Sequence, residues 1–317
     1  MPQTTKNQHF VPQSLLKHFS DNQERVVYIY DSKRDKLRPP TSVNRVLSEN
    51  YFYDRDNLIE NFLAESVEGP AAPIFEGIVC DPQKRIVCNK IDLLKFITVQ
   101  LNRTPIALFD SLENIGNFTD LLIQQHGELN GFDPEVLKDI KFKINNPKAI
   151  LVQQTIERAL NWPLIDDLEW HLLIDQTNIG FLICDHPVVH YNWYLRDSND
   201  VSYTSIASCG IQIFLPISHS ITLCLYDKKI YNLGQKSAFY TELKNESDVL
   251  LLNELQFRNR DSFIVFSSRT QSDYILKACK KFPANSLHEN NAWASDFTPL
   301  EDKNLSQQSP HGECKYI

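Results

Sequence analysis

The sequence has no long apolar run and no targeting signal. None of its apolar stretches approaches the roughly 20 residues needed to cross a bilayer. The N-terminus also lacks the basic-then-apolar layout of a signal peptide. We therefore expect a cytosolic protein.

The chain also lacks paired cysteines. Its cysteines are odd in number, scattered, and form no C-x-x-C motif: Cys80, Cys88, Cys184, Cys209, Cys224, Cys279 and Cys314. This pattern argues against a structural zinc site and against a disulfide framework. We expect most of these thiols to be buried in strands or helices.

Excess positive charge is absent too. The chain has 32 Lys and Arg against 40 Asp and Glu, a net charge of −8, which counts against non-specific coating of nucleic acid. Local basic stretches remain at residues 33–38, 138–143 and 277–281, and each is read first as a solvated face. With 317 residues and 42% hydrophobic content, the chain can bury a sizeable core.

The segment from Lys6 to Pro12 combines a polar pair with apolar residues and a proline. Pro12 favours extended backbone before it and is well placed as the first residue of a short helix. Gln8 and His9 would lie on the extended lead-in to that helix. His9 is either a partly buried histidine bonded to backbone or a functional imidazole.

The middle of the chain has helical periodicity. A helix from Asn57 carries Glu60, Glu65 and Glu68 and is expected to end at Gly69-Pro70. A second helix starts near Ile91 and is interrupted at Arg103-Thr104-Pro105. A buried Arg103 there needs either a structural ion pair or a bound anion. Further helices are expected at 119–129, 133–144 and 146–160.

Strand patterns flank this helical middle. We predict a strand at 26–30 followed by a loop to residue 40, a hairpin over 168–184 that ends in Cys184-Asp185-His186-Pro187, and a hairpin over 210–226. A helix from Ser247 carries Asn253, Gln256 and Arg260 beside its apolar stripe. A strand at 263–266 and a helix at 272–281 follow.

These elements predict an α+β fold, in which a mainly antiparallel β-sheet packs against a helical middle segment. We expect a single domain over residues 1–284. Its helical part would span about 57–162, and its sheet part 26–30 and 168–268. Residues 285–317 would form a loosely ordered C-terminal tail.

Several segments together resemble one bacterial family, domain-of-unknown-function family 4238. They are Gln8-His9-Phe10-Val11-Pro12 with Leu16 and Phe19, Phe96 through Arg103-Thr104-Pro105, Phe181 through Asp185 to Val188, Phe214 to Ser218, and Leu252-Asn253 leading to Phe266-Ser267-Ser268. Members usually have Ser-Asp-Asn-Pro where this chain has Cys184-Asp185-His186-Pro187. The resemblance implies a bacterial cytosolic protein and supports the choice of residues, but it implies no particular reaction.

Three functions stay open. The first is metal-independent phosphodiester cleavage, most plausibly of RNA in a toxin-like or phage-defence role, because a histidine, an acid and an arginine supply the groups this reaction needs. The second is a non-catalytic module that binds a nucleotide, another small ligand or a protein. The third is a hydrolase that uses a divalent metal. The expected catalytic residues are His9, Gln8, Asp185, His186 and Arg103, the substrate-binding residues Asn253, Gln256 and Arg260, and the alternative metal ligands Asp185, His186, His190 and Glu68.

Overall fold

A computed structural model of the chain describes residues 5–20, 25–84, 89–138, 140, 143–196, 205–234 and 238–287. The predicted loosely ordered tail lies almost wholly outside these residues. Among the described helices, none combines the length and the apolar character that a membrane crossing would require.

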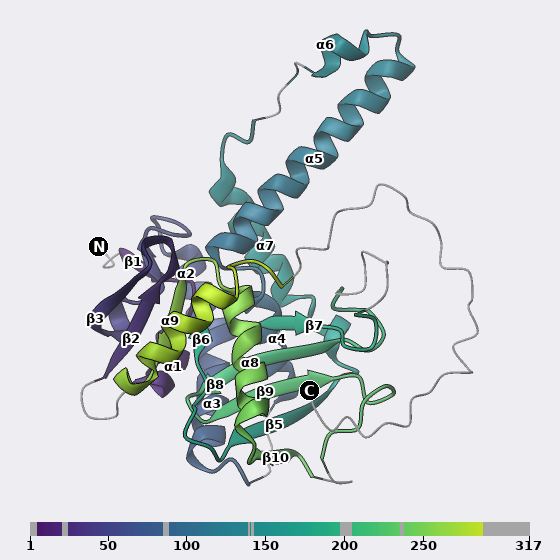
Figure 1. Cartoon of the computed structure of the whole chain (residues 1–317). Helices are drawn as coiled ribbons and strands as arrows, with labels where there is room; N and C mark the ends of the chain where they lie inside the picture. Colours follow the sequence, from purple (N-terminus) through teal and green to yellow (C-terminus); the bar gives the residue numbers. More distant parts are fainter. Residues whose placement is uncertain are drawn as a thin grey trace.

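A five-stranded sheet forms the centre of the molecule (Figure 1). Its strand order is β10-β5-β9-β8-β7, and only β10 and β5 run parallel. The strands are β5 (Glu169–Asp175), β7 (Val189–Tyr191), β8 (Gln212–Ser218), β9 (Ile221–Tyr226) and β10 (Tyr240–Leu243). The predicted hairpin over 210–226 is confirmed, because β8 and β9 are antiparallel neighbours.

A four-stranded sheet lies beside it with strand order β3-β2-β11-β6. The strands are β2 (Val26–Asp31), β3 (Lys36–Ser42), β6 (Ile183–Cys184) and β11 (Phe263–Phe266). The first predicted strand and the last do share this sheet, since β11 pairs with β2 antiparallel. A small antiparallel pair joins β1 (Asn7–His9) to β4 (Ser48–Asn50), which confirms the extended lead-in to the first helix.

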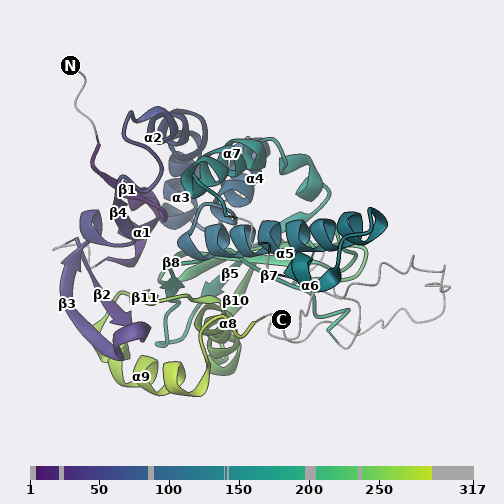
Figure 2. The ribbon, with the colours of Figure 1, turned by 90° about the horizontal axis from the view of Figure 1, so that it is seen from above.

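Helices cover both faces of the five-stranded sheet (Figure 2). Leu172 and Ile174 of β5 pack into the core with the helices of the middle segment, whereas Leu173 between them packs on the opposite face with Val249 and Leu252. Every residue of β8 is buried for this reason. The helices are α1 (Gln13–Leu16), α2 (Leu58–Leu63), α3 (Gly69–Cys80), α4 (Lys90–Gln100), α5 (Pro105–Leu129), α6 (Pro134–Lys138), α7 (Pro147–Ala159), α8 (Glu246–Asn259) and α9 (Ser272–Lys281).

The predicted α+β fold with a helical middle is therefore confirmed, but several local predictions are wrong. The helix expected at 119–129 is the second half of α5, and the helix expected at 133–144 is described only as the short α6. The strands at 169–175 and 183–184 do not form a hairpin: β5 pairs with β9 and β10, whereas β6 pairs with β11 in the other sheet. The expected loop after Asp31 contains β3, where Pro39 and Pro40 are tolerated because β3 is an edge strand. Gly69-Pro70 does not end the helix.

The helix continues because a π-helical turn, Ala64–Glu68, joins α2 to α3. Pro70 lies in the first turn of α3, where a residue does not need a backbone N–H to form an intrahelical hydrogen bond. Gly69 donates its N–H to the carbonyl of Ala64, five residues back, and a Cβ on Gly69 would lie 2.5 Å from that oxygen. The glycine thus permits the wide turn rather than terminating the helix.

Candidate functional site

Arg103 is the centre of a buried polar cluster. It lies in the short turn between α4 and α5, where the predicted interruption at Pro105 is confirmed, and its side chain is fully buried. Its Nη1 donates to Glu68 Oε1 at 2.6 Å and its Nε donates to Gln100 Oε1 at 2.7 Å. Its Nη2 is buried and has no hydrogen-bond partner among the described residues. One guanidinium nitrogen is therefore left to bind something else.

Glu68 brings a carboxylate to this arginine from the π-helical turn. Burial lowers the pKa of Arg103, but Glu68, Tyr53 and Glu60 together outweigh this effect and the pKa lies above its ordinary value. The carboxylate side chain is 25% exposed, so the pair reaches the surface on the Glu68 side. π-helical turns inside α-helices are frequent at functional sites.

His9 lies near the same pair. It is 7% exposed, and its ring is hydrogen-bonded to the backbone of Val43, as the structural interpretation of this residue expected. Its Nε2, however, is buried without a hydrogen-bond partner among the described residues. Burial lowers the pKa of His9 and the charge of Arg103 lowers it slightly further, whereas the hydrogen bond with Val43 and the charge of Glu68 partly raise it. The neutral imidazole thus keeps a lone pair available as a base.

Glu60 completes the cluster from α2. Burial raises the pKa of Glu60 to about 7, the negative charge of Glu68 adds to this, and Arg103 partly offsets it. A carboxyl group with this pKa is partly protonated at neutral pH and can act as an acid. Glu60 was expected on a helix but was not among the site residues expected from the sequence.

The π-helical turn explains why helical periodicity missed Glu60. Eight residues apart on a regular α-helix, Glu60 and Glu68 would differ by about 80° in direction. A π-turn accommodates one additional residue and rotates the following side chain back by about 100°. The two carboxylates then share a face, in agreement with their electrostatic interaction.

Gln8 fixes the N-terminal strand rather than pointing an amide into the cluster. Its Oε1 accepts from the backbone N–H groups of Tyr53 at 2.8 Å and Asp54 at 3.3 Å, and its Nε2 donates to Asp54 O at 2.9 Å. Tyr53 in turn donates its hydroxyl to the backbone carbonyl of His9 at 3.2 Å. Gln8 therefore positions His9.

The carboxylate of Asp185 does not join Arg103. Its Oδ1 accepts from Asp261 N at 2.9 Å, and its Oδ2 accepts from Ser262 N at 2.7 Å and Phe263 N at 3.0 Å. Burial raises the pKa of Asp185 to about 7 although these backbone donors favour the carboxylate. This acid holds the turn before β11, and the acid beside Arg103 is Glu68.

His186 contacts the cluster indirectly, through Thr104. Its Nδ1 is 2.7 Å from the hydroxyl of Thr104, the neighbour of Arg103. Burial, with His190 nearby, lowers the pKa of His186 to about 4, so the ring is neutral. His186 can orient Thr104 and the turn that carries Arg103.

The expected substrate-binding residues on α8 contact the chain's own backbone. Asn253 and Gln256 accept from Leu182 N and Cys184 N and donate to Gly180 O and Pro187 O. Arg260 donates to the carbonyls of Phe257, Cys279 and Phe282 and to Ser32 Oγ. Their polar groups hold α8 against the segment 180–188 and α9 rather than facing a ligand.

The alternative metal ligands are not assembled. Within the described part of the chain, no group of three or more His, Cys, Asp or Glu side chains is arranged to hold a metal ion. Asp185 is bound by backbone N–H groups and Glu68 by Arg103, so these two of the four proposed ligands already serve other partners.

Comparison with known proteins gives one match. The family model described as protein of unknown function (DUF4238) matches residues 7–270, a range that contains every residue of the cluster. No curated protein and no solved structure matches the chain.

Proposed function

The chain belongs to the DUF4238 family of proteins of unknown function, and we propose from its buried polar cluster that it cleaves RNA phosphodiester bonds without a metal ion. The observation that carries this proposal is the combination around Arg103 of a neutral histidine with a free Nε2 and a carboxyl group whose pKa is about 7. A neutral imidazole that accepts a proton and a carboxyl group that donates one are what this reaction needs.

Each group has one role. His9 Nε2 takes the proton of a ribose 2′-hydroxyl, and the 2′-oxygen attacks phosphorus. Glu60 gives its proton to the 5′-oxygen as the P–O5′ bond breaks. Arg103 Nη2 donates to the phosphorane oxygens, whose negative charge grows in the transition state. The products are a 2′,3′-cyclic phosphate and a 5′-hydroxyl end.

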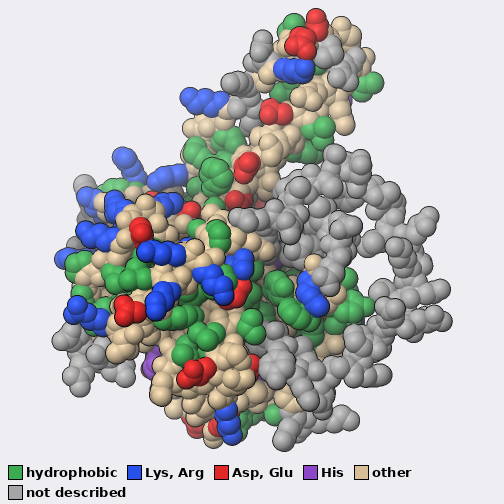
Figure 3. Space-filling view, in the orientation of Figure 1, with side chains coloured by type: hydrophobic (Ala, Val, Ile, Leu, Met, Phe, Trp, Pro, Cys, Tyr) green, Lys and Arg blue, Asp and Glu red, His purple; other side chains and the backbone are tan. Residues whose placement is uncertain are grey.

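A basic face supports RNA as the substrate in spite of the net charge of −8. Figure 3 shows Lys and Arg side chains gathered over β2, β3 and α9. Packing of α9 against the sheet through Tyr30, Phe266 and Ile275 brings the exposed residues Lys33, Arg34 and Lys36 onto the same side as the lysines of α9, Lys277, Lys280 and Lys281. Phosphate backbones bind to such faces by releasing counterions.

Labelled RNA incubated with the purified protein in EDTA tests the proposal. We expect cleavage by the wild type and a fall of about 100-fold or more in His9→Ala and in Glu60→Gln. Because His9 is buried, His9→Ala should also lower the melting temperature, so cleavage is compared at a temperature where both variants are folded. His126→Ala, on the exposed surface of α5, is the matched control and should cleave normally. DNA of the same sequence should resist, since it lacks the 2′-hydroxyl.

The pH profile adds an independent check. Activity should fall above pH 7 as Glu60 loses its proton, and fall at acid pH as His9 gains one. Equal cleavage by the wild type and His9→Ala, or cleavage that requires an added metal, would refute the proposal. A cytoplasmic location and a toxin-like or phage-defence role stay predictions.

A non-catalytic nucleotide-binding module is the second candidate. The buried and unpartnered Nη2 of Arg103 favours it, because this donor can bind a phosphate without any chemistry. Calorimetry with mononucleotides would identify this function if RNA stays intact while wild-type protein, but not Arg103→Met, releases heat on mixing.

A further inference from the structure

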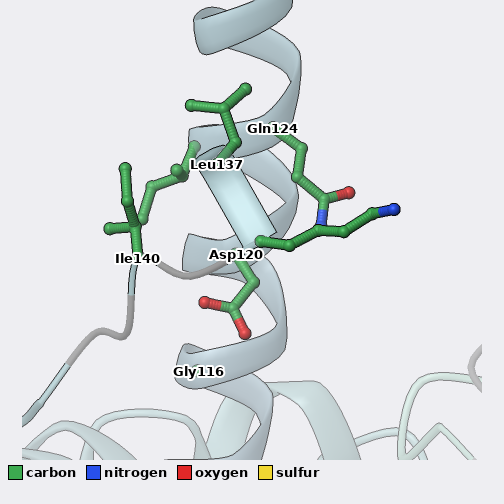
Figure 4. Close-up of a pocket in the computed structure, with 7 residues that line it drawn as sticks. Gly116, Asp120, Gln124, Leu137 and Ile140 are labelled. Atoms are coloured by element: carbon green, nitrogen blue, oxygen red, sulfur yellow. The ribbon is translucent and has the colours of Figure 1, made fainter. Parts of the chain in front are cut away.

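The helices α5 and α6 form an arm that rises from the body of the molecule (Figure 1). With 25 residues, α5 is about 37 Å long. The short α6 folds back onto one face of α5, where Leu137 packs against Gly127. A Cβ on Gly127 would lie only 2.4 Å from the side chain of Leu137. A hollow of about 340 Å³ lies between the two helices. Figure 4 shows residues that line it, among them Gly116, Asp120 and Leu137.

The opposite face of α5 carries an apolar stripe that nothing in the described structure covers. Phe118, Leu122 and Leu129 are spaced by four and seven residues and so lie on one side of the helix. They point away from the side of Gly116, Asp120 and Leu137. Phe118 is 62% and Leu129 82% exposed, and Leu121 beside them is 45% exposed. We call the set Phe118, Leu121, Leu122 and Leu129 the arm stripe.

The arm stripe contains no charge. The other residues on this side of α5 are uncharged too, namely Ala107, Ser111, Asn114, Ile115 and Gln125, and α5 has no Lys or Arg along its whole length. The described acidic residues Asp110, Glu113 and Asp120 lie to the side of the stripe or on the α6 face. An identical stripe can therefore approach without bringing like charges together.

We propose that the arm stripe is a homodimerisation surface, on which α5 of a second copy packs antiparallel about a two-fold axis. Such a contact is isologous, so one self-complementary patch serves both copies. With the axis between Leu122 and Gln125, Phe118 of one copy faces Leu129 of the other.

The area of the stripe agrees with this occupant. A large apolar side chain offers roughly 150–200 Å² when fully exposed, so at the observed exposures the four residues offer roughly 400 Å² in each copy. If all of this area were buried, two copies would remove roughly 800 Å² of apolar surface from water. The flanking polar side chains must therefore add roughly 400 Å² to reach the roughly 1,200 Å² at which specific interfaces begin. Figure 1 shows the arm extending beyond the described body of the molecule.

Sedimentation of the full chain over a concentration series tests the proposal. We expect a dimer for the wild type and at least a ten-fold weaker association for the double variant Phe118→Asp/Leu129→Asp. The matched control is Leu160→Asp/Leu251→Asp, which places the same charges on exposed apolar residues of other surfaces, 72% and 45% exposed. The control should associate like the wild type.

Hydrogen exchange of the unaltered chain gives a second measurement that does not depend on how the variants fold. Amides of the arm stripe should be protected more strongly at concentrations where the dimer forms than at concentrations where it dissociates. Each of three results would overturn the proposal: a wild type that is still monomeric at about 100 µM, an equal loss of association in the control variant, or hydrogen exchange that does not depend on protein concentration.

Discussion

At the scale of single residues, burial decides what the polar groups can do. Arg103 is fully buried and is stabilised by Glu68 and Gln100, whereas the pair of Lys17 with Glu76 is exposed. A buried cation that loses its partner cannot recover the lost interaction energy from water. The same holds for a buried carboxylate that loses its cation. The two ion pairs should therefore differ strongly in their contribution to stability.

Replacing Arg103 by Met should lower the free energy of unfolding by about 2–4 kcal/mol, because Glu68 and the amide oxygen of Gln100 lose their donor. Urea unfolding measures the change. Lys17→Met, the exposed control, should cost less than about 1 kcal/mol. Similar costs in both variants would mean that Arg103 is not a structural centre of the cluster.

At the scale of elements, two local devices build the site. The π-helical turn Ala64–Glu68 directs Glu68 and Glu60 to one face. Helix α8 takes the place of a neighbouring strand for the segment 180–188, because its side-chain amides form hydrogen bonds with the backbone of that segment. Asn259 extends this set, since its Nδ2 donates to His186 O at 2.5 Å. The spacing of Asn253, Gln256 and Asn259 by three residues keeps all three amides on one side of the helix.

Gly69→Ala should disturb the π-helical turn, since its Cβ would collide with a backbone oxygen that cannot move aside. We expect a loss of about 1–3 kcal/mol in unfolding free energy, together with reduced RNA cleavage as Glu68 shifts. Gly116→Ala in α5 is the control: its Cβ meets nothing within 4 Å, and stability should stay equal or rise by up to about 1 kcal/mol. Denaturant unfolding with a cleavage assay decides between the outcomes.

Gln256→Met keeps the side-chain volume but leaves Cys184 N and Pro187 O without their partners. Two buried backbone groups left unpaired should cost about 2–4 kcal/mol in unfolding free energy. Gln153→Met on the exposed surface of α7 should cost less than about 0.5 kcal/mol by the same measurement. A variant of Gln256 that binds RNA more weakly at unchanged stability would instead restore its expected role with substrate.

At the scale of the whole molecule, burial of histidines makes the fold sensitive to acid. Burial lowers the pKa of His18, His171, His186 and His190 to about 4. The unfolded chain binds these protons near pH 6.5, so between pH 6.5 and 4 it binds more protons than the folded chain. The contribution of the four histidines is therefore complete above pH 6.5 and is lost as the pH falls toward 4. Glu60 and Asp185, whose pKa values are raised to about 7, contribute in the opposite direction over this range, but they are two groups against four.

The melting temperature should drop steeply between pH 6.5 and 4. His171→Gln should reduce the difference in unfolding free energy between pH 7 and pH 5 by about 2 kcal/mol, because one of these protonation sites is removed. His126→Gln, on the exposed surface of α5, should leave the pH dependence as it is in the wild type. A flat profile from pH 7 to 4 would contradict the assigned burial of these rings.

The sequence alone determined the elements whose signals are local. The strand at 26–31 followed from its β-branched and aromatic residues, the end of α4 from Pro105, and the α9 boundaries from apolar periodicity. The family motifs also pointed to His9 and Arg103, which the structure brings into one cluster.

Only the tertiary structure decided which partners those residues have. Strands β5 and β6 are neighbours in the chain yet lie in different sheets, because β5 pairs with β9 and β6 pairs with β11. Asp185 and Arg103 were both expected as catalytic residues, but three backbone N–H groups bind Asp185 elsewhere. The carboxyl groups near Arg103 are those of Glu68 and Glu60, which a π-helical turn that helical periodicity does not predict brings to one face. Pairing and burial depend on contacts between distant segments, and no local pattern of residues specifies them.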